Sequence, residues 1–196
     1  MNKNCLLCGV GGQGVVLASK LIAFAAMEQG KFVRTTETIG MAQRGGSVVS
    51  HVRIGEEVHS PLIPLKKADL ILAFEPAEAV RCLPYLNAGG TVIVSSKAIL
   101  PVTSSLGDGI YEGTEMLAYL EKNIPRLAVL DGESILSQAG SSKVLNVALL
   151  GAAAASGVLD ITLDEMEMAI EKNVKEKFLE INKKALVLGK AAFERA

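Results

Sequence analysis

The sequence predicts an α/β protein: a single Rossmann-like, three-layer domain with a mostly parallel, partly mixed sheet and a helical C-terminal segment. Two observations lead to this prediction. Apolar runs of strand length alternate with longer runs of helical character along residues 4–131. A glycine-rich turn, GVGGQG at residues 9–14, joins the first such strand to the first helix, as in a βαβ unit.

Length and composition set the number of domains and exclude one class of ligand. The chain has 196 residues, 49% of them hydrophobic, which is enough to bury a substantial core, so we expect residues 1–196 to form one domain. Twenty basic and 21 acidic residues leave a formal charge of −1, and no basic run is dense. The composition therefore disfavours nucleic-acid binding.

The apolar segments are too short for a membrane protein. The longest nearly apolar stretch, residues 144–155, falls short of the roughly 20 residues that a membrane-spanning helix needs. The first residues, MNKNCLLCGVGGQG, lack the apolar core of a signal peptide. We therefore expect a cytoplasmic protein with no membrane contact.

The first half of the chain is expected to contain both parallel and antiparallel strands. A helix over residues 14–29, ended by Gly30, predicts a right-handed crossover between two parallel, paired strands. Gly55 and Glu56 offer a tight turn between the two strands of a hairpin. The expected strands of this half cover residues 4–8, 31–36, 47–54 and 57–60.

The second half returns to regular alternation and ends in helices. Pro76 occupies the first position of a helix that reaches about residue 86, and NAGG at residues 87–90 predicts a turn. Thr162 and Glu165 form a capping box at the start of a further helix. The remaining expected elements are strands at 68–74, 91–96 and 126–131 and helices at 114–123, 142–156 and about 178–192.

The three cysteines do not indicate a metal or redox site. Cys5 and Cys8 belong to one predicted strand and are three positions apart, so their side chains point to opposite faces of the sheet. We expect both to be small buried core residues. Three cysteines, counting Cys82, cannot ligate a four-cysteine iron–sulfur cluster by themselves.

The first glycine turn is compatible with several roles. Gly9, Gly11 and Gly14 fit the G-x-G-x-x-G spacing, in which backbone and helix N-terminus approach a phosphate. Glu37 lies at a tolerable distance along the chain for the acidic residue of a dinucleotide site. A tight structural turn, a nicotinamide or flavin site, another anionic ligand and a subunit contact all stay open.

A second glycine-bearing segment, GMAQRGGS at residues 40–47, is more unusual. Arg44 carries a permanent charge and a fork of donors. Gly45 and Gly46 could expose successive N–H groups as an anion-binding nest, so that both glycine segments face one ligand. Alternatively, the two glycines merely start a strand and Arg44 is solvated.

Four polar residues elsewhere receive structural interpretations. His51 and Arg53 share a strand face and are expected to form a satisfied surface pair. Glu75 precedes Pro76 and is expected to cap a helix. Asn146, alone among apolar neighbours, is expected to pack against a loop backbone. The chain shows no Ser-His-Asp or Cys-His set and no plausible metal site, so catalytic machinery is not visible.

Four segments, taken in order, resemble the gamma-domain family of 2-oxoacid:ferredoxin oxidoreductases. They are GVGGQG, TETIGMAQRGGSVVSHVRIG, ADLILAFEPAEAVRCLPYL with GGTVIV, and NVALLGAAA. The resemblance covers nearly the whole chain, and the intact GMAQRGGSV is its specific part.

The resemblance implies a non-catalytic but required subunit, equivalent to the beta subunit of the members that convert indolepyruvate. The assembled enzyme would convert an aryl pyruvate, coenzyme A and oxidised ferredoxin to an aryl acetyl-CoA, carbon dioxide and reduced ferredoxin. Thiamine diphosphate, Mg²⁺ and iron–sulfur clusters would belong to a large partner subunit, and this chain alone would bind no cofactor.

By motif position, the resemblance also implies a surface near the assembled active site or coenzyme A. Its residues are Gly9, Gly11, Gly12, Gln13, Gly14, Arg44, Gly45 and Gly46.

Other functions stay open at this point. The chain could be the gamma subunit of a pyruvate, 2-oxoisovalerate or 2-oxoglutarate enzyme, because substrate choice should depend mainly on the partner that binds thiamine diphosphate. A stand-alone NAD- or flavin-binding protein that uses residues 9–14 and Glu37 belongs to a different class. A binding or regulatory module without enzymatic activity is a third.

Overall fold

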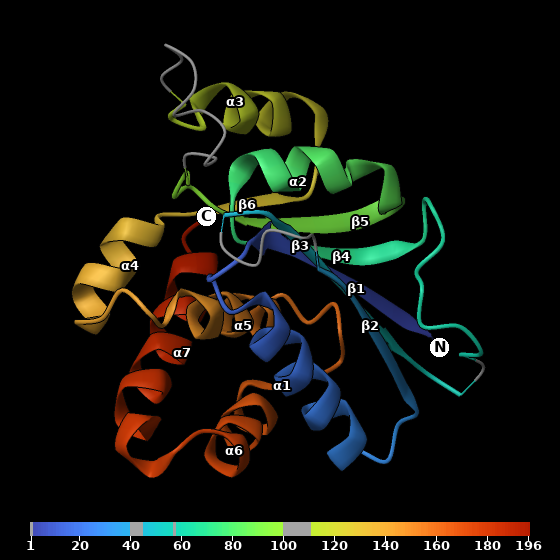
Figure 1. Ribbon diagram of the computed structural model, residues 1–196, viewed down its shortest axis with the longest axis vertical. Helices are drawn as coiled ribbons and strands as arrows, with labels where there is room; N and C mark the ends of the chain where they lie inside the picture. Colours follow the sequence, from blue (N-terminus) through green and yellow to red (C-terminus); the bar gives the residue numbers. More distant parts are fainter. Residues whose placement is uncertain (1, 40–44, 57, 100–110) are drawn as a thin grey trace.

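A computed structural model describes residues 2–39, 45–56, 58–99 and 111–196. Six strands form one mixed sheet with helices on both faces, so the predicted three-layer α/β architecture is confirmed (Figure 1). No helix in these ranges is long and apolar enough to cross a bilayer.

The strands are β1 (Lys3–Val10), β2 (Val33–Ile39), β3 (Ser47–Ile54), β4 (Ala68–Ala73), β5 (Leu86–Ser95) and β6 (Leu127–Leu130). The helices are α1 (Val15–Glu28), α2 (Pro76–Cys82), α3 (Thr114–Asn123), α4 (Gly132–Ala139), α5 (Leu145–Ala155), α6 (Leu163–Asn173) and α7 (Leu179–Phe193), with short 3₁₀ turns at Leu83–Tyr85 and Glu176–Phe178.

The strand order is β2-β3-β1-β4-β5-β6, which corrects the predicted pairing of the first two strands. β1 and β2 are not neighbours, because β3 lies between them and is antiparallel to both. Ser50 of β3 is opposite Leu7 on one side and Glu37 on the other. From β1 to β6 all pairs are parallel, so the expected mixture of strand directions is confirmed.

Two local predictions were wrong. Residues 58–60 form no strand, and residue 57 lies outside the described ranges; β3 takes β2 as its antiparallel partner instead. Residues 87–90 are not a turn but part of β5. Here the pairing with β4 shifts register between Ala68 and Leu70, so the glycines lie in an irregular strand rather than in a reversal.

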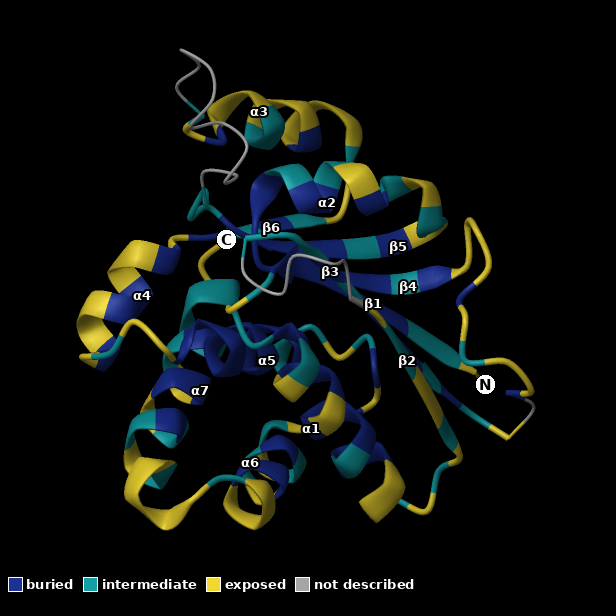
Figure 2. Cartoon of the chain, viewed as in Figure 1, coloured by how far each residue is buried: buried dark blue, intermediate teal, exposed yellow. Residues whose placement is uncertain are grey.

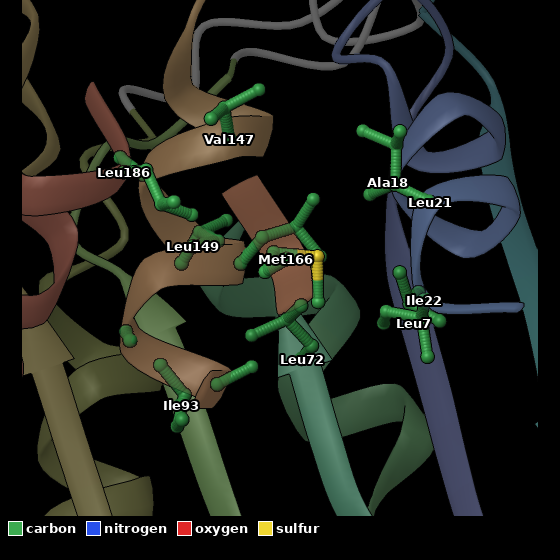
Figure 3. Packing of buried hydrophobic residues seen from close by; sticks show 14 of the residues in the cluster. Leu7, Ala18, Leu21, Ile22, Leu72, Ile93, Val147, Leu149, Met166 and Leu186 are labelled. Carbon is green, nitrogen blue, oxygen red and sulfur yellow. The ribbon is translucent and has the colours of Figure 1, made fainter. Parts of the chain in front are cut away.

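Two hydrophobic clusters lie on opposite faces of the sheet. The larger packs the sheet against α1, α4, α5, α6 and α7, and Figure 3 shows Leu7, Leu72 and Ile93 of the strands facing this layer. The smaller lies under α2 and α3. Figure 2 shows that α5 is buried almost throughout, whereas α3 is largely exposed.

The cysteines and caps follow the sequence predictions. Cys5 belongs to the larger cluster and Cys8 to the smaller, and both are fully buried. The carboxylate of Glu75 accepts the N–H of Glu78 at the start of α2, as a cap should.

His51 departs from the expected surface pair, because its side chain is only 3% exposed. The segment after β3 folds back over this strand face, and the N–H of Ile63 donates to His51 Nδ1 at 3.2 Å. The ring of Tyr85 meets the imidazole edge to face. Arg53 anchors the same segment by donating to the carbonyl of Ser60 at 2.9 Å.

This burial makes stability depend on pH. Burial lowers the pKa of His51 below its ordinary value. The unfolded chain, with a histidine pKa of about 6.5, therefore takes up the proton first, and the free energy of unfolding falls as the pH decreases from about 6.5 through the lowered folded-state pKa.

We expect His51→Gln to reduce the change in urea midpoint between about pH 7 and pH 5. His59→Gln changes an exposed histidine and should keep the pH dependence of the wild type. Equal pH dependence in His51→Gln and the wild type would contradict a role for His51.

Helices α5 and α7 cross at the distance set by two glycines. A Cβ atom at Gly189 would lie 1.7 Å from the carbonyl oxygen of Ala148, and one at Gly151 would lie 2.0 Å from that of Leu186. Both obstacles are backbone atoms, so no side chain can rotate away. Any larger residue must push the two helices apart.

Gly189→Ala should therefore lower the free energy of unfolding by about 3 kcal/mol, measured by urea denaturation. Lys184→Ala, on the exposed side of α7, is the control and should change it by less than about 0.5 kcal/mol. Similar values for the two variants would show that α5 and α7 do not depend on this close approach.

Candidate functional site

The candidate site lies at the carboxyl ends of β1 and β4, from which the chain continues toward opposite edges of the sheet. β1 and β4 are parallel neighbours, and the chain continues from β1 toward the β2–β3 edge but from β4 toward β5. In open α/β sheets, ligands bind at such a point, outside the carboxyl ends of the strands. The first glycine turn, residues 11–14, occupies this position between β1 and α1.

Gln13 joins the carboxyl ends of β1 and β4. Its Oε1 accepts the N–H of Val10 at 2.7 Å, and its Nε2 donates to the carbonyl of Phe74 at 2.9 Å. A Cβ at Gly9 would lie 2.7 Å from that Oε1 and 2.8 Å from the Cβ of Phe74. Gly9 therefore leaves the space that the side chain of Gln13 occupies. The amide of Gln13 is already hydrogen-bonded within the protein.

The structure brings the two glycine segments together. The N–H of Gly11 donates to the carbonyl of Gly46 at 2.8 Å, and the N–H of Gly45 donates to the carbonyl of Gly11 at 3.3 Å. The N–H of Gly45 is therefore already hydrogen-bonded within the protein. Arg44 lies outside the described residues.

A cavity of about 560 Å³ opens beside the turn. It lies between the N-termini of α1 and α5, and no side chain of the described residues caps either helix. Uncapped helix N-termini present N–H groups and partial positive charge to an anion. The lining residues are Gly11, Gly12, Gln13, Gly14, Leu17, Lys97, Ile99, Leu136, Ser142, Lys143, Leu145 and Asn146.

Asn146 is the clearest sign of a missing polar partner. It is 4% exposed, yet its Oδ1 forms no hydrogen bond with any described residue. Its Nδ2 lies where a Cβ on Gly14 would come within 2.6 Å, so the predicted packing of Asn146 against a loop is confirmed. Gly14 also has a φ of +80°, which glycine adopts without strain. A buried amide with a free oxygen at a cavity wall indicates a binding position.

Two lysines add charge to the cavity. Lys97 follows β5, and Lys143 precedes α5. Lys97 Nζ lies 4.0 Å from the carboxylate of Glu133, whose side chain is 79% exposed. Neither lysine belongs to a recognisable sequence motif, because the two come from separate connections that only the fold brings together.

A second, apolar cavity lies on the other side of the glycine turn. It has about 470 Å³ and shares Gly11, Gly12 and Gly14 with the first. Its remaining lining residues are Val10, Val15, Val16 and Val48. The turn is therefore a ridge with a basic cavity on one side and an apolar cavity on the other.

The strand order counts against a dinucleotide site. In that type of site, the acidic residue stands at the end of the strand next to β1. Glu37 is on β2, which β3 separates from β1. It is thus one strand too far away for the ribose-binding role.

The described residues do not bring together a metal-binding set. No three His, Cys, Asp or Glu side chains among them converge as metal ligands would. Cys5 is separated from Cys8 and Cys82 by the sheet. Burial raises the pKa of the Cys5 thiol, which favours the protonated form over the thiolate that metals require.

The sequence matches one family along most of its length. Residues 4–192 match the family model described as "Pyruvate ferredoxin/flavodoxin oxidoreductase". The chain therefore belongs to this family, which confirms the resemblance that its motifs indicated.

Two relatives illustrate the range of similarity. The chain is 41% identical to "Indolepyruvate oxidoreductase subunit IorB" of Archaeoglobus fulgidus, with 96% of this chain and 94% of the relative covered. It is 28% identical to "Pyruvate/ketoisovalerate oxidoreductases common subunit gamma" of Thermococcus litoralis, with 95% and 93% covered. Both relatives are named as oxidoreductase subunits.

A solved structure shares the fold. The gamma subunit of a keto/oxoacid ferredoxin oxidoreductase from Geobacter sulfurreducens PCA superimposes with a TM-score of 0.72 at 26% identity, and 99% of each chain is covered. The sheet with its extra antiparallel strands is thus similar to that of a gamma subunit.

The structural role of Gln13 is testable. Gln13→Ala leaves the N–H of Val10 and the carbonyl of Phe74 without their partner, and should lower the free energy of unfolding by about 2 kcal/mol in urea denaturation. Gln138→Ala, on the exposed face of α4, should have an effect below about 0.5 kcal/mol. If Gln13→Ala is as stable as the wild type, Gln13 does not hold the two strand ends together.

Proposed function

We propose that this chain is the small, non-catalytic subunit of an indolepyruvate ferredoxin oxidoreductase of the cytoplasm. The observation that favours this substrate is the difference in identity between its relatives. The chain is 41% identical to an indolepyruvate oxidoreductase subunit and 28% identical to a gamma subunit of the pyruvate and ketoisovalerate enzymes, at nearly equal coverage.

The proposed reaction is the oxidative decarboxylation of an aryl pyruvate. The 2-oxoacid, coenzyme A and oxidised ferredoxin give the aryl acetyl-CoA, carbon dioxide and reduced ferredoxin. Thiamine diphosphate with Mg²⁺ and iron–sulfur clusters, bound by the large partner subunit, would supply the decarboxylation and the electron transfer. The cysteines of this chain, divided by the sheet, do not fit a cluster of its own.

The proposed role of this chain is to bind coenzyme A beside the partner's active site. Coenzyme A carries several phosphates, and the basic cavity offers two helix N-termini, Lys97 and Lys143 for them. The Oδ1 of Asn146, which has no partner among the described residues, would accept a hydrogen bond from the ligand. The glycine turn within residues 9–14 would allow close backbone approach to the ligand. We assign Gly45 and Gly46, whose backbone is hydrogen-bonded to Gly11, and the adjoining Arg44 to the same binding surface.

The substrate can be identified by a direct assay. The chain would be co-purified with its partner without oxygen, and ferredoxin reduction measured with indolepyruvate, pyruvate, 2-oxoisovalerate and 2-oxoglutarate in the presence of coenzyme A. Activity confined to aryl pyruvates supports the proposal. Preference for another 2-oxoacid would make the chain the gamma subunit of that enzyme instead.

The coenzyme A site predicts the effect of one charge change. Lys143→Gln in the assembled enzyme should raise the KM for coenzyme A about tenfold and leave kcat within about twofold, because one charge-assisted contact to a phosphate is lost. Arg44→Ala should also raise this KM or lower turnover.

The matched control is Lys184→Gln, which removes the same charge from the exposed side of α7. It should leave both constants unchanged. An unchanged KM in Lys143→Gln would remove the basic cavity from the coenzyme A site.

A further inference from the structure

The start of α2 carries a carboxylate that the proposed function does not use. Glu78 belongs to this short helix and is only 9% exposed. Ser47 Oγ donates to its Oε2 at 2.7 Å, and Arg81 forms an ion pair with it. Burying a carboxylate is unfavourable unless hydrogen bonds or an ion pair compensate for the lost hydration.

Ser47 connects this carboxylate to the candidate site. It is the first residue of β3 and directly follows Gly45 and Gly46. The backbone of these two glycines is hydrogen-bonded to Gly11 in both directions. Glu78 therefore reaches the glycine turn through one side-chain hydrogen bond and two adjoining residues.

Hydrogen bonds to Glu75 and Tyr111 hold the first turn of α2, which contains Glu78, in place. Its N–H donates to Glu75 Oε2 at 3.0 Å, and the hydroxyl of Tyr111 donates to the other oxygen of Glu75. The N–H of Ala77 donates to the same tyrosine oxygen at 3.1 Å. These hydrogen bonds fix the first turn of α2. The carboxylate of Glu78 is therefore a rigid acceptor for the hydroxyl of Ser47.

The ion pair does not explain the burial. The Arg81 side chain is 56% exposed, and a pair of this kind, three residues apart on a helix surface, contributes little to stability. The bond to Ser47 links this carboxylate to a distant part of the chain, the start of β3.

We infer that Glu78 is a positioning residue, which holds Gly45 and Gly46 against Gly11 through Ser47. The inference rests on the proposed coenzyme A site, because the glycine turn that it steadies is the ridge beside the basic cavity. Loss of the tether lets the second glycine segment separate from the first. Binding of coenzyme A weakens, while the chemistry on the partner subunit is unaffected once coenzyme A saturates.

The test uses the assembled enzyme with Ser47→Ala, which removes the tether and leaves Glu78 with Arg81. The KM for coenzyme A should rise about three- to tenfold, with kcat within about twofold of the wild type. Ser47→Thr keeps the hydroxyl and should restore the wild-type KM. Arg81→Gln removes the ion pair but not the tether, and should leave KM unchanged.

Amide hydrogen exchange gives a readout that does not depend on activity. The N–H of Gly11 is bonded to Gly46, so peptides that contain residues 9–14 should exchange faster in Ser47→Ala and at the wild-type rate in Ser47→Thr and Arg81→Gln. Peptides from α7, on the other side of the sheet, should be unchanged in all three.

The outcomes separate this inference from the proposed function. If Lys143→Gln raises the KM for coenzyme A but Ser47→Ala changes neither KM nor exchange, the positioning role is wrong and the site stands. If neither variant changes KM while Ser47→Ala accelerates exchange, the tether holds the glycine segments but the coenzyme A site is wrong. An equal KM increase in Ser47→Ala and Ser47→Thr would also overturn the role of the hydroxyl.

Discussion

The arrangement depends on the junction between the carboxyl ends of β1 and β4, where Gln13 binds Val10 on one strand and Phe74 on the other. The chain leaves these two strands in opposite directions just beyond their last backbone contact, in which the N–H of Phe74 donates to the carbonyl of Cys8 at 2.8 Å. The glycine turn rests on this amide, α1 starts from the turn, and the cavity lies between α1 and α5. Gln13 therefore supports the turn that separates the two cavities through contacts within the protein.

Much of the fold follows from local sequence signals. Buried strands, the glycine-bounded first helix and the caps at Glu75 and Thr162 occur where pattern and cap chemistry predict them. The order of the strands does not follow, because β3 enters between β1 and β2 through contacts that are distant along the chain. Residues 87–90 illustrate the same limit: glycines indicate a turn, but this stretch is an irregular part of β5, between Leu86 and Thr91, which pair with Ala68 and Leu70 of β4.

The candidate site likewise contains residues that the sequence predicts and residues that only the fold brings together. Its glycines could be recognised, because their spacing between a strand and a helix has a physical purpose. Lys97 and Lys143 could not, since each is an ordinary lysine until β5 and α5 place them at one cavity. Asn146 stood out as a polar residue in an apolar helix. Only the fold shows that it lines the cavity and that its Oδ1 has no hydrogen-bond partner within the part of the chain that the structure describes.

A structure of the assembled enzyme with coenzyme A bound would test the proposed coenzyme A site most directly. We predict that the phosphates lie in the basic cavity, near the N-termini of α1 and α5 and within reach of Lys97 and Lys143, with the glycine ridge against the ligand. Coenzyme A bound wholly to the partner subunit, with this cavity empty or filled by a partner side chain, would contradict it.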